Sequence, residues 1–272
     1  MFISLAGCQK KPEGSPANPK NENSPHSTEI DAAQIIERYR AIDNSRNSTI
    51  KMRAQINGQS PSVGLGELTA PRQIQLTIYR KREPDGRLMM LVEFTAPVEE
   101  RDRDGLITVF PDGRIEAVRY VQSTDSFLVA TDATSEDALF GLTPQELAES
   151  QPEKYDFVLA GEDTYEATAV YRLDGKLKQG AESKFPRLVL LISKQNFAAL
   201  QAEFYDNHSE LARRLAVSKM EQIAGHWTRL RWSIDNRARL KKIDFEAVEV
   251  KYDQNLSDSI FTREHLKKIA SR

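Results

Sequence analysis

Residues 77–94 read TIYRKREPDGRLMMLVEF, and this stretch decides the fold class. Two runs with strand character flank the tripeptide Pro84-Asp85-Gly86. Proline presets φ at the first turn position, aspartate bonds to its own backbone, and glycine accepts a positive φ. The same tripeptide returns at residues 111–113, between LITVF and RIEAVRYV. Each stretch therefore predicts a β-hairpin.

Strand patterns continue on both sides of these hairpins. Residues 52–56 and 73–78 alternate apolar and polar side chains, which is typical of half-buried strands. In residues 242–252 the apolar phase slips by one position, so we expect a bulge or sharp bend near Glu246–Ala247. Further strands are predicted in the runs YDFVLAG, EATAVYRL, RLVLLISK, LQAEFYD, ARRLAVSKM, TRLRWSI and KIDFEAVEVKY.

Helix signals are fewer and lie at the ends and in the middle of the chain. Thr28 is placed as the N-cap of a first helix, with Asp31 completing an imperfect capping box. Short helical pieces are expected to begin at Ser135 and Thr143. A last helix should begin after Phe261, with residues 261 and 266 forming a hydrophobic staple.

About ten strands and three helical pieces predict a mainly β protein with a few helices. The expected architecture is one strongly curved antiparallel sheet that is partly covered on one face.

Composition excludes several classes of site. The 272 residues include one Cys, and the four His do not cluster, so neither a disulfide framework nor a structural zinc site is expected. The net charge of -2 gives no reason to expect nucleic acid as a partner. No catalytic or cofactor-binding motif occurs, so we expect a protein that is not an enzyme and needs no cofactor. The acidic run EERDRD (residues 99–104) is interpreted as a solvated turn or a helix N-terminus.

The N-terminal residues suggest processing and lipid anchoring. Residues 3–11 read ISLAGCQKK, and Leu5-Ala6-Gly7-Cys8 resembles the bacterial lipoprotein signal. In that signal the bond between Gly7 and Cys8 is cut and the Cys8 thiol is lipidated. Residues 9–28 hold four Pro and no large apolar side chain, so this segment is expected to be a disordered tether. The predicted organisation is a signal-peptide remnant at 1–7, a tether at 8–28 and a folded domain at 29–272.

Three segments carry a resemblance to a known family: SFLVATDATSEDALFG (126–141), RLVLLISKQNFAALQAEFYDNHSELARRL (187–215) and VEVKYDQNLSDSIFTREHL (248–266). Together with the order of the elements, they resemble the bacterial outer-membrane lipoprotein-sorting family of LolA/LolB-like carriers, in its uncharacterised branch. The likeness spans roughly residues 29–268.

The resemblance implies an incomplete, half-open β-barrel around helices, with an apolar cavity that takes lipid or lipoprotein acyl chains. Each methylene moved into such a cavity is favoured by roughly 0.8 kcal/mol. Cys8 would hold the domain on the periplasmic side of the envelope, and Gln9 after it resembles the signal for outer-membrane sorting. Candidate cavity-lining residues are Ile74, Leu76, Ile78, Leu91, Leu230, Trp232 and Ile234.

A second hypothesis stays open at this point. The same fold would serve an interaction or sensory module if side chains fill the cavity and function lies on loops such as EERDRDG. Periodicity alone does not separate a filled interior from an open one.

Overall fold

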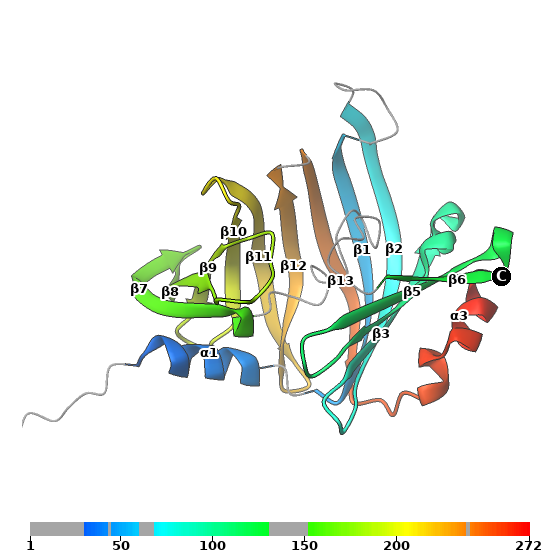
Figure 1. Cartoon of the computed structure of the whole chain (residues 1–272), viewed down its shortest axis with the longest axis horizontal. Helices are drawn as coiled ribbons and strands as arrows, with labels where there is room; N and C mark the ends of the chain where they lie inside the picture. The colour runs from blue at the N-terminus through cyan, green and yellow to red at the C-terminus, as the bar shows by residue number, and fades with distance from the viewer. Residues whose placement is uncertain (1–29, 43–44, 60–67, 131–151, 238–239) are drawn as a thin grey trace, which may run out of the picture. The chain divides into compact units, whose positions relative to one another are not determined.

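The computed structural model describes residues 30–42, 45–59, 68–130, 152–237 and 240–272 (Figure 1). The chain divides into two units, Met1–Ile30 and Asp31–Arg272. The second unit contains all the strands and helices discussed below. The signal remnant and the tether lie outside the described residues.

Thirteen strands form one antiparallel sheet. Along the chain they are β1 (Asn47–Gln59), β2 (Leu68–Arg82), β3 (Leu88–Ala96), β4 (Gly105–Val109), β5 (Ile115–Val121), β6 (Ser126–Ala130), β7 (Tyr155–Tyr165), β8 (Thr168–Leu177), β9 (Arg187–Ser193), β10 (Ala199–Tyr205), β11 (Leu211–Ile223), β12 (His226–Asn236) and β13 (Lys241–Tyr252).

The strand order is β6-β5-β4-β3-β2-β1-β13-β12-β11-β10-β9-β8-β7, so β6 and β7 are the two edges. The sheet curves strongly without closing, as a half-open barrel (Figure 1). This confirms the predicted fold class, although the expected strand number of about ten was too low. The strand that sequence patterning missed is β6, whose five residues SFLVA do not alternate and do not flank a Pro-Asp-Gly turn.

Both predicted hairpins are present. In the first turn, the Asp85 carboxylate accepts a hydrogen bond from the Arg87 N–H at 3.1 Å, and Gly86 has a φ of 87°. In the second, Asp112 accepts from the Arg114 N–H at 3.0 Å. The turn chemistry therefore acts as the sequence predicts.

A bulge interrupts β13 close to the expected place. Its register against β1 shifts between Ala247 and Glu249, which leaves Val248 as the extra residue, one position beyond the expected 246–247. The Val248 side chain is 52% exposed. Because of the bulge, the apolar residues that follow return to the same face as Phe245.

The first helix, α1 (Ala32–Ala41), begins later than expected. Its N-cap is Asp31, not Thr28: the Asp31 carboxylate accepts from the Gln34 N–H at 2.8 Å. The Gln34 side chain in turn accepts from the Asp31 N–H at 3.1 Å. This complete capping box satisfies two helix-terminal donors.

The last helix, α3 (Arg263–Ala270), begins where predicted. Thr262 caps it by accepting from the His265 N–H at 3.2 Å, and Phe261 and Leu266 meet in one apolar cluster. The helical pieces expected at Ser135 and Thr143 lie outside the described residues. Within the described part of the chain, no helix is long and apolar enough to cross a membrane.

Four short 3-10 turns complete the described elements: η1 (Val98–Arg103), η2 (Gln122–Thr124), η3 (Pro152–Lys154) and η5 (Asp258–Phe261).

Candidate functional site

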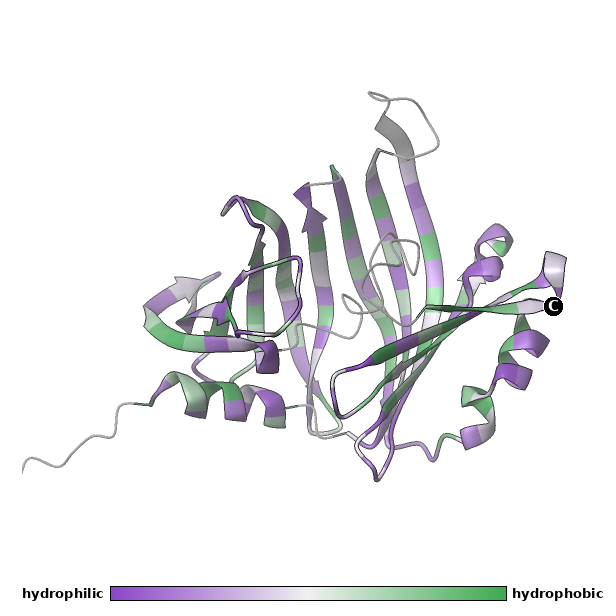
Figure 2. Cartoon of the chain, viewed as in Figure 1, coloured by the Kyte–Doolittle hydropathy of each residue, from purple (hydrophilic) through white to green (hydrophobic). Residues whose placement is uncertain are grey.

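The two faces of the sheet differ in chemistry, and Figure 2 shows polar and apolar residues alternating along its central strands. We call the face that carries Phe245 and Trp232 the inner face. Paired residues of neighbouring strands share a face. One inner-face row runs from Ile56 through Ile243 and Ile234 to Leu215, across β1, β13, β12 and β11.

A second row lies beside the first. Ala54 pairs with Phe245, Phe245 with Trp232, and Trp232 with Val217. The Trp232 and Phe245 rings stack with centroids 5.1 Å apart and planes at 12°. Phe245 is buried, whereas Trp232 is only partly buried. The aromatic pair therefore presents an accessible apolar surface at the middle of the inner face.

These rows belong to one continuous apolar cluster that reaches from β5 to β12. Its buried members are Met52, Ala54, Ile56, Ile74, Leu76, Met90, Val92, Phe94, Ile107, Ile115, Ile234, Ile243 and Phe245. Partly buried side chains, including Ile78, Leu215 and Trp232, pack against it. Several of these residues were not singled out from the sequence. Alternation marks Phe245 as facing one side of a strand but does not reveal which strands become its neighbours.

The predicted lining residues are placed in three environments. Ile74, Leu76, Ile78, Trp232 and Ile234 all belong to the inner cluster. Leu230 is partly buried at an irregularity of β12, where Arg231 pairs with Lys219 and Arg229 with Met220.

Leu91 lies in the opposite, outer-face cluster. It is buried against Leu266 and Ile269 of α3, together with Leu106 of β4. In β3 the side chains on both faces are buried, so the strand shows no alternation, and its sequence does not indicate which face Leu91 occupies.

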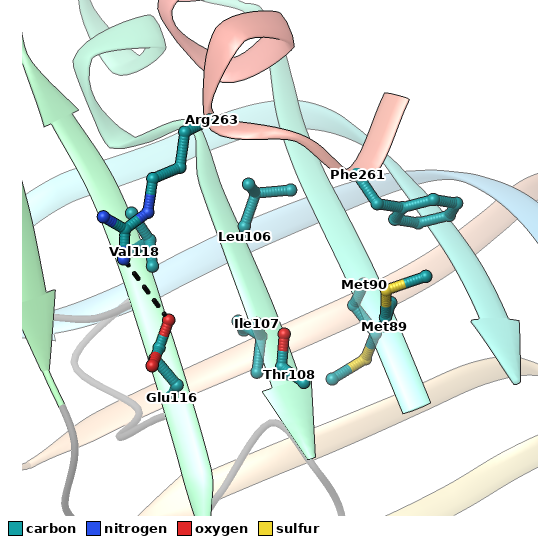
Figure 3. A pocket seen from close by; sticks show the side chains of 9 residues that line it. All are labelled: Met89, Met90, Leu106, Ile107, Thr108, Glu116, Val118, Phe261 and Arg263. Carbon is teal, nitrogen blue, oxygen red and sulfur yellow. Dashed lines mark ion pairs between the residues drawn. The ribbon is translucent and has the colours of Figure 1, made fainter. Parts of the chain in front are cut away.

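A small pocket of about 110 Å³ lies beside this outer cluster, between strands β3–β5 and the start of α3 (Figure 3). Met89, Leu106, Val118 and Phe261 supply much of its apolar lining. An ion pair between Arg263 and Glu116, 3.6 Å apart, lies within the lining. The pocket is too small for an acyl chain, because drug-sized ligands already need about 300 Å³ or more.

On the central strands β1, β12 and β13 the outer face is charged. Lys51 and Lys251 contact Glu249 at 2.6 Å and 2.5 Å, and these contacts lower the pKa of Glu249 to about 2, the Lys251 hydrogen bond being the larger cause. Arg231 contacts Glu246 at 2.9 Å. Central strands thus carry exposed charges of both signs on this face and buried or partly buried apolar side chains on the other.

Of the two interpretations of the acidic run at residues 99–104, the solvated turn was wrong and the helix N-terminus is confirmed, since Glu99 and Glu100 lie in the first turn of a short helix. This helix is η1, in which the Glu100 side chain is only 6% exposed and contacts Arg72 at 3.0 Å and Arg103 at 3.3 Å. Asp104 follows, 2% exposed, and accepts a hydrogen bond from the Phe94 N–H at 2.7 Å. Two of the carboxylates that a binding loop would need are therefore held inside the fold.

The Glu100→Gln variant is expected to lower the free energy of unfolding by about 2 kcal/mol, because both guanidinium groups lose their counter-charge near a buried position. Their partial exposure keeps the loss below that of a fully buried pair. Chemical denaturation of the full chain measures it. Glu99→Gln is the matched control: its exposed side chain should leave stability unchanged within about 0.5 kcal/mol. Equal losses in both variants would contradict the assignment.

The described residues hold no group of three or more His, Cys, Asp or Glu that could bind a metal ion. His226 contacts two polar residues. Its Nε2 lies 3.5 Å from the Asp253 carboxylate, and its ring centroid lies 4.4 Å from that of Tyr252. These contacts join the start of β12 to the end of β13.

The comparisons with known proteins fit this geometry. A family model described as "Uncharacterized protein" matches residues 86–268, more than half of the chain. A LolA superfamily protein from Nitrosomonas europaea superposes with a TM-score of 0.60 at 16% identity, over 87% of this chain and 100% of that one. The chain belongs to the family of uncharacterised proteins that this model describes, and it shares the fold of the LolA superfamily protein. The resemblance predicted from the sequence is thereby confirmed.

Two further structures share this LolA/LolB-like fold. A DUF1329 family protein from Desulfovibrio piger is 20% identical, with a TM-score of 0.74 over 85% of this chain and 96% of that one. An outer membrane lipoprotein-sorting protein domain from Vibrio parahaemolyticus is 16% identical, with a TM-score of 0.75 over 86% and 97%. No curated protein matches the sequence. At these identities the structures establish the fold of this chain.

Proposed function

We propose that this protein is an envelope lipoprotein that binds lipid or lipoprotein acyl chains against the inner face of its sheet and serves their sorting or transport. The observation that carries the proposal is the continuous apolar inner cluster on a sheet that does not close. An open curved sheet of this kind leaves the partly buried apolar side chains that border the cluster accessible to an acyl chain. The LolA/LolB-like fold supports the same reading.

Trp232 is the proposed centre of the acyl-binding surface. Its partial exposure leaves ring area for a ligand, while stacking on Phe245 fixes its orientation. Ile78 and Leu215 extend the partly buried surface on either side. Binding and release by such a surface require no catalytic group, since transfer is an exchange between sites of different affinity.

The chain contains two tryptophans, which permits a direct test. The full chain carrying Trp227→Phe keeps Trp232 as its reporter, and the full chain carrying Trp232→Phe keeps Trp227. Trp227 pairs with Gln222 near the β11–β12 turn, outside the inner cluster. We expect monomeric dibromostearate to quench Trp232 fluorescence saturably and to leave Trp227 nearly unaffected. Equal quenching of both reporters, or of neither, would contradict acyl binding at the inner face.

The membrane anchor forms a separate part of the proposal. Lipidated Cys8 would tether the domain through residues 9–28 to the periplasmic side of the envelope, with Gln9 favouring the outer membrane. One acyl chain binds membranes only marginally, whereas two or more hold a protein stably. Mass spectrometry of the protein isolated from bacterial membranes should find a multiply acylated Cys8 at the mature N-terminus. An unmodified Cys8 thiol in the native protein would exclude the anchor.

A further inference from the structure

The strand β7 forms one open edge of the sheet, at the left in Figure 1. It pairs with β8 on one side, and no described strand pairs with its other side. Its 11 residues make it a long edge strand. Unpaired backbone N–H and C=O groups along such an edge are a template for pairing with another chain.

Several features that normally prevent pairing are missing from this edge, although α1 lies against part of β7. The sequence YDFVLAGEDTY contains no Lys, Arg or Pro. Val158 is 63% exposed and Leu159 38% exposed, although both are apolar residues in the middle of the strand. They point to opposite faces, so the apolar surface wraps around the edge. One irregularity, at Ala160 between Leu159 and Gly161, leaves the pairing with β8 continuous on both sides.

The charges on β7 are all negative. Asp156 and Asp163 flank Val158 on the outer face, as their pairing with Lys176, Val170 and Asp174 of β8 shows. Asp156 has a long contact of 3.9 Å to Lys178. Asp163 accepts a hydrogen bond from the Thr164 N–H, and it forms no ion pair with any described residue. An apolar centre thus lies between two weakly compensated carboxylates.

We propose that the outer edge of β7 binds an extended segment of a partner protein by β-strand addition. The segment has an apolar centre that covers Val158 and basic residues that face Asp156 and Asp163. Backbone hydrogen bonds supply affinity in this recognition mode, and the alternate side chains supply specificity. The proposal does not depend on acyl binding, because β7 lies outside the strands that form the inner cluster.

Charge argues against a second copy of this chain as the occupant. A symmetric antiparallel pairing centred between Leu159 and Ala160 brings Asp156 of each copy opposite Asp163 of the other. Like charges directly opposite one another destabilise a strand pair.

The test uses the full chain and a fluorescent peptide, Lys-Thr-Val-Thr-Val-Thr-Lys, whose lysines and valines share one face, with a twin in which Glu replaces each Lys. Hydrogen exchange read by mass spectrometry locates the bound peptide, and fluorescence anisotropy measures its affinity. We expect the lysine peptide to slow exchange in residues 155–165 and the glutamate twin to have no effect. Asp163→Lys and Val158→Lys should each weaken binding about tenfold, a loss of about 1.4 kcal/mol.

Val248→Lys is the matched control, since Val248 is also an exposed valine, at 52%, but lies on the central strand β13. It should bind the peptide as the wild type does, and the thermal midpoints of all three variants should agree. Equal binding of both peptides, equal loss in Val248→Lys, or absence of protection at β7 would each overturn the proposal. A peptide-free dimer that Val158→Lys dissociates would also overturn it, in favour of a second copy.

Discussion

At pH 8 the Asp104→Asn variant is expected to be more stable than the wild-type protein by about 3–4 kcal/mol. Burial raises the pKa of Asp104 from 3.8 to about 7, and the nearby Glu93 carboxylate adds to this, while the hydrogen bond from the Phe94 N–H opposes it. In the unfolded chain the same carboxyl group titrates near its ordinary value. The folded state therefore binds an extra proton between about pH 4 and pH 7.

This extra proton determines whether stability rises or falls with pH. Because the folded state holds it more tightly than the unfolded state, the contribution of Asp104 to stability is fully present below pH 4 and is lost as the pH rises through 7. Moving a pKa from 3.8 to about 7 corresponds to about 4 kcal/mol, since each unit is worth about 1.4 kcal/mol. An asparagine keeps an oxygen for the Phe94 N–H and carries no charge at any pH.

The measurement is the free energy of unfolding of both proteins in urea between pH 4.5 and pH 8. The difference between them should grow steadily up to about pH 7 and then level off. Asp102→Asn changes an exposed carboxylate two residues away and should follow the wild-type profile. Parallel profiles for wild type and Asp104→Asn would show that Asp104 ionises normally and is not buried as described.

Replacing Leu266 with Ala is expected to cost about 3–4 kcal/mol, within the range for fully buried leucines. The side chain is completely buried in the outer cluster, against Leu91 and Leu106 of the sheet. The helix that carries it, α3, has eight residues, too few to be stable alone in water. Packing of Leu266 and Ile269 therefore holds the helix on the sheet.

Urea unfolding measures the loss, and hydrogen exchange in residues 263–270 shows whether α3 opens locally at a lower cost than the whole domain. Lys268→Ala on the exposed side of the same helix should change stability by less than about 0.5 kcal/mol. An unchanged exchange rate in Leu266→Ala would mean that other contacts fix the helix.

The sequence determined those elements that depend on contacts between residues only a few positions apart. The two Pro-Asp-Gly turns specify their hairpins because each residue type favours its own turn position, and Thr262 specifies the start of α3 by capping it. The phase slip in residues 242–252 indicated the bulge to within one position. Where two local solutions compete, as at Thr28 and Asp31, the complete capping box with Gln34 prevails.

Only the tertiary structure decided which strands become neighbours and what covers each face. Alternation in β12 and β13 predicts that Trp232 and Phe245 each face one side of a strand, but the pairing of the strands makes them stack. Leu91 belongs to the outer cluster because α3, some 175 positions later in the chain, covers that face. Glu100 and Asp104 are buried because groups on distant strands pair with them. Arg72 of β2 contacts Glu100, and the Phe94 N–H of β3 donates a hydrogen bond to Asp104.

One physical cause separates the features that the sequence determined from those that the tertiary structure decided. Turns, caps and strand periods depend on contacts between residues a few positions apart, so the sequence by itself determined a mainly β protein with these hairpins and with α3. Burial depends on contacts between residues far apart, so the open edges, the continuous inner face and the buried carboxylates were decided only when all thirteen strands came together in one sheet.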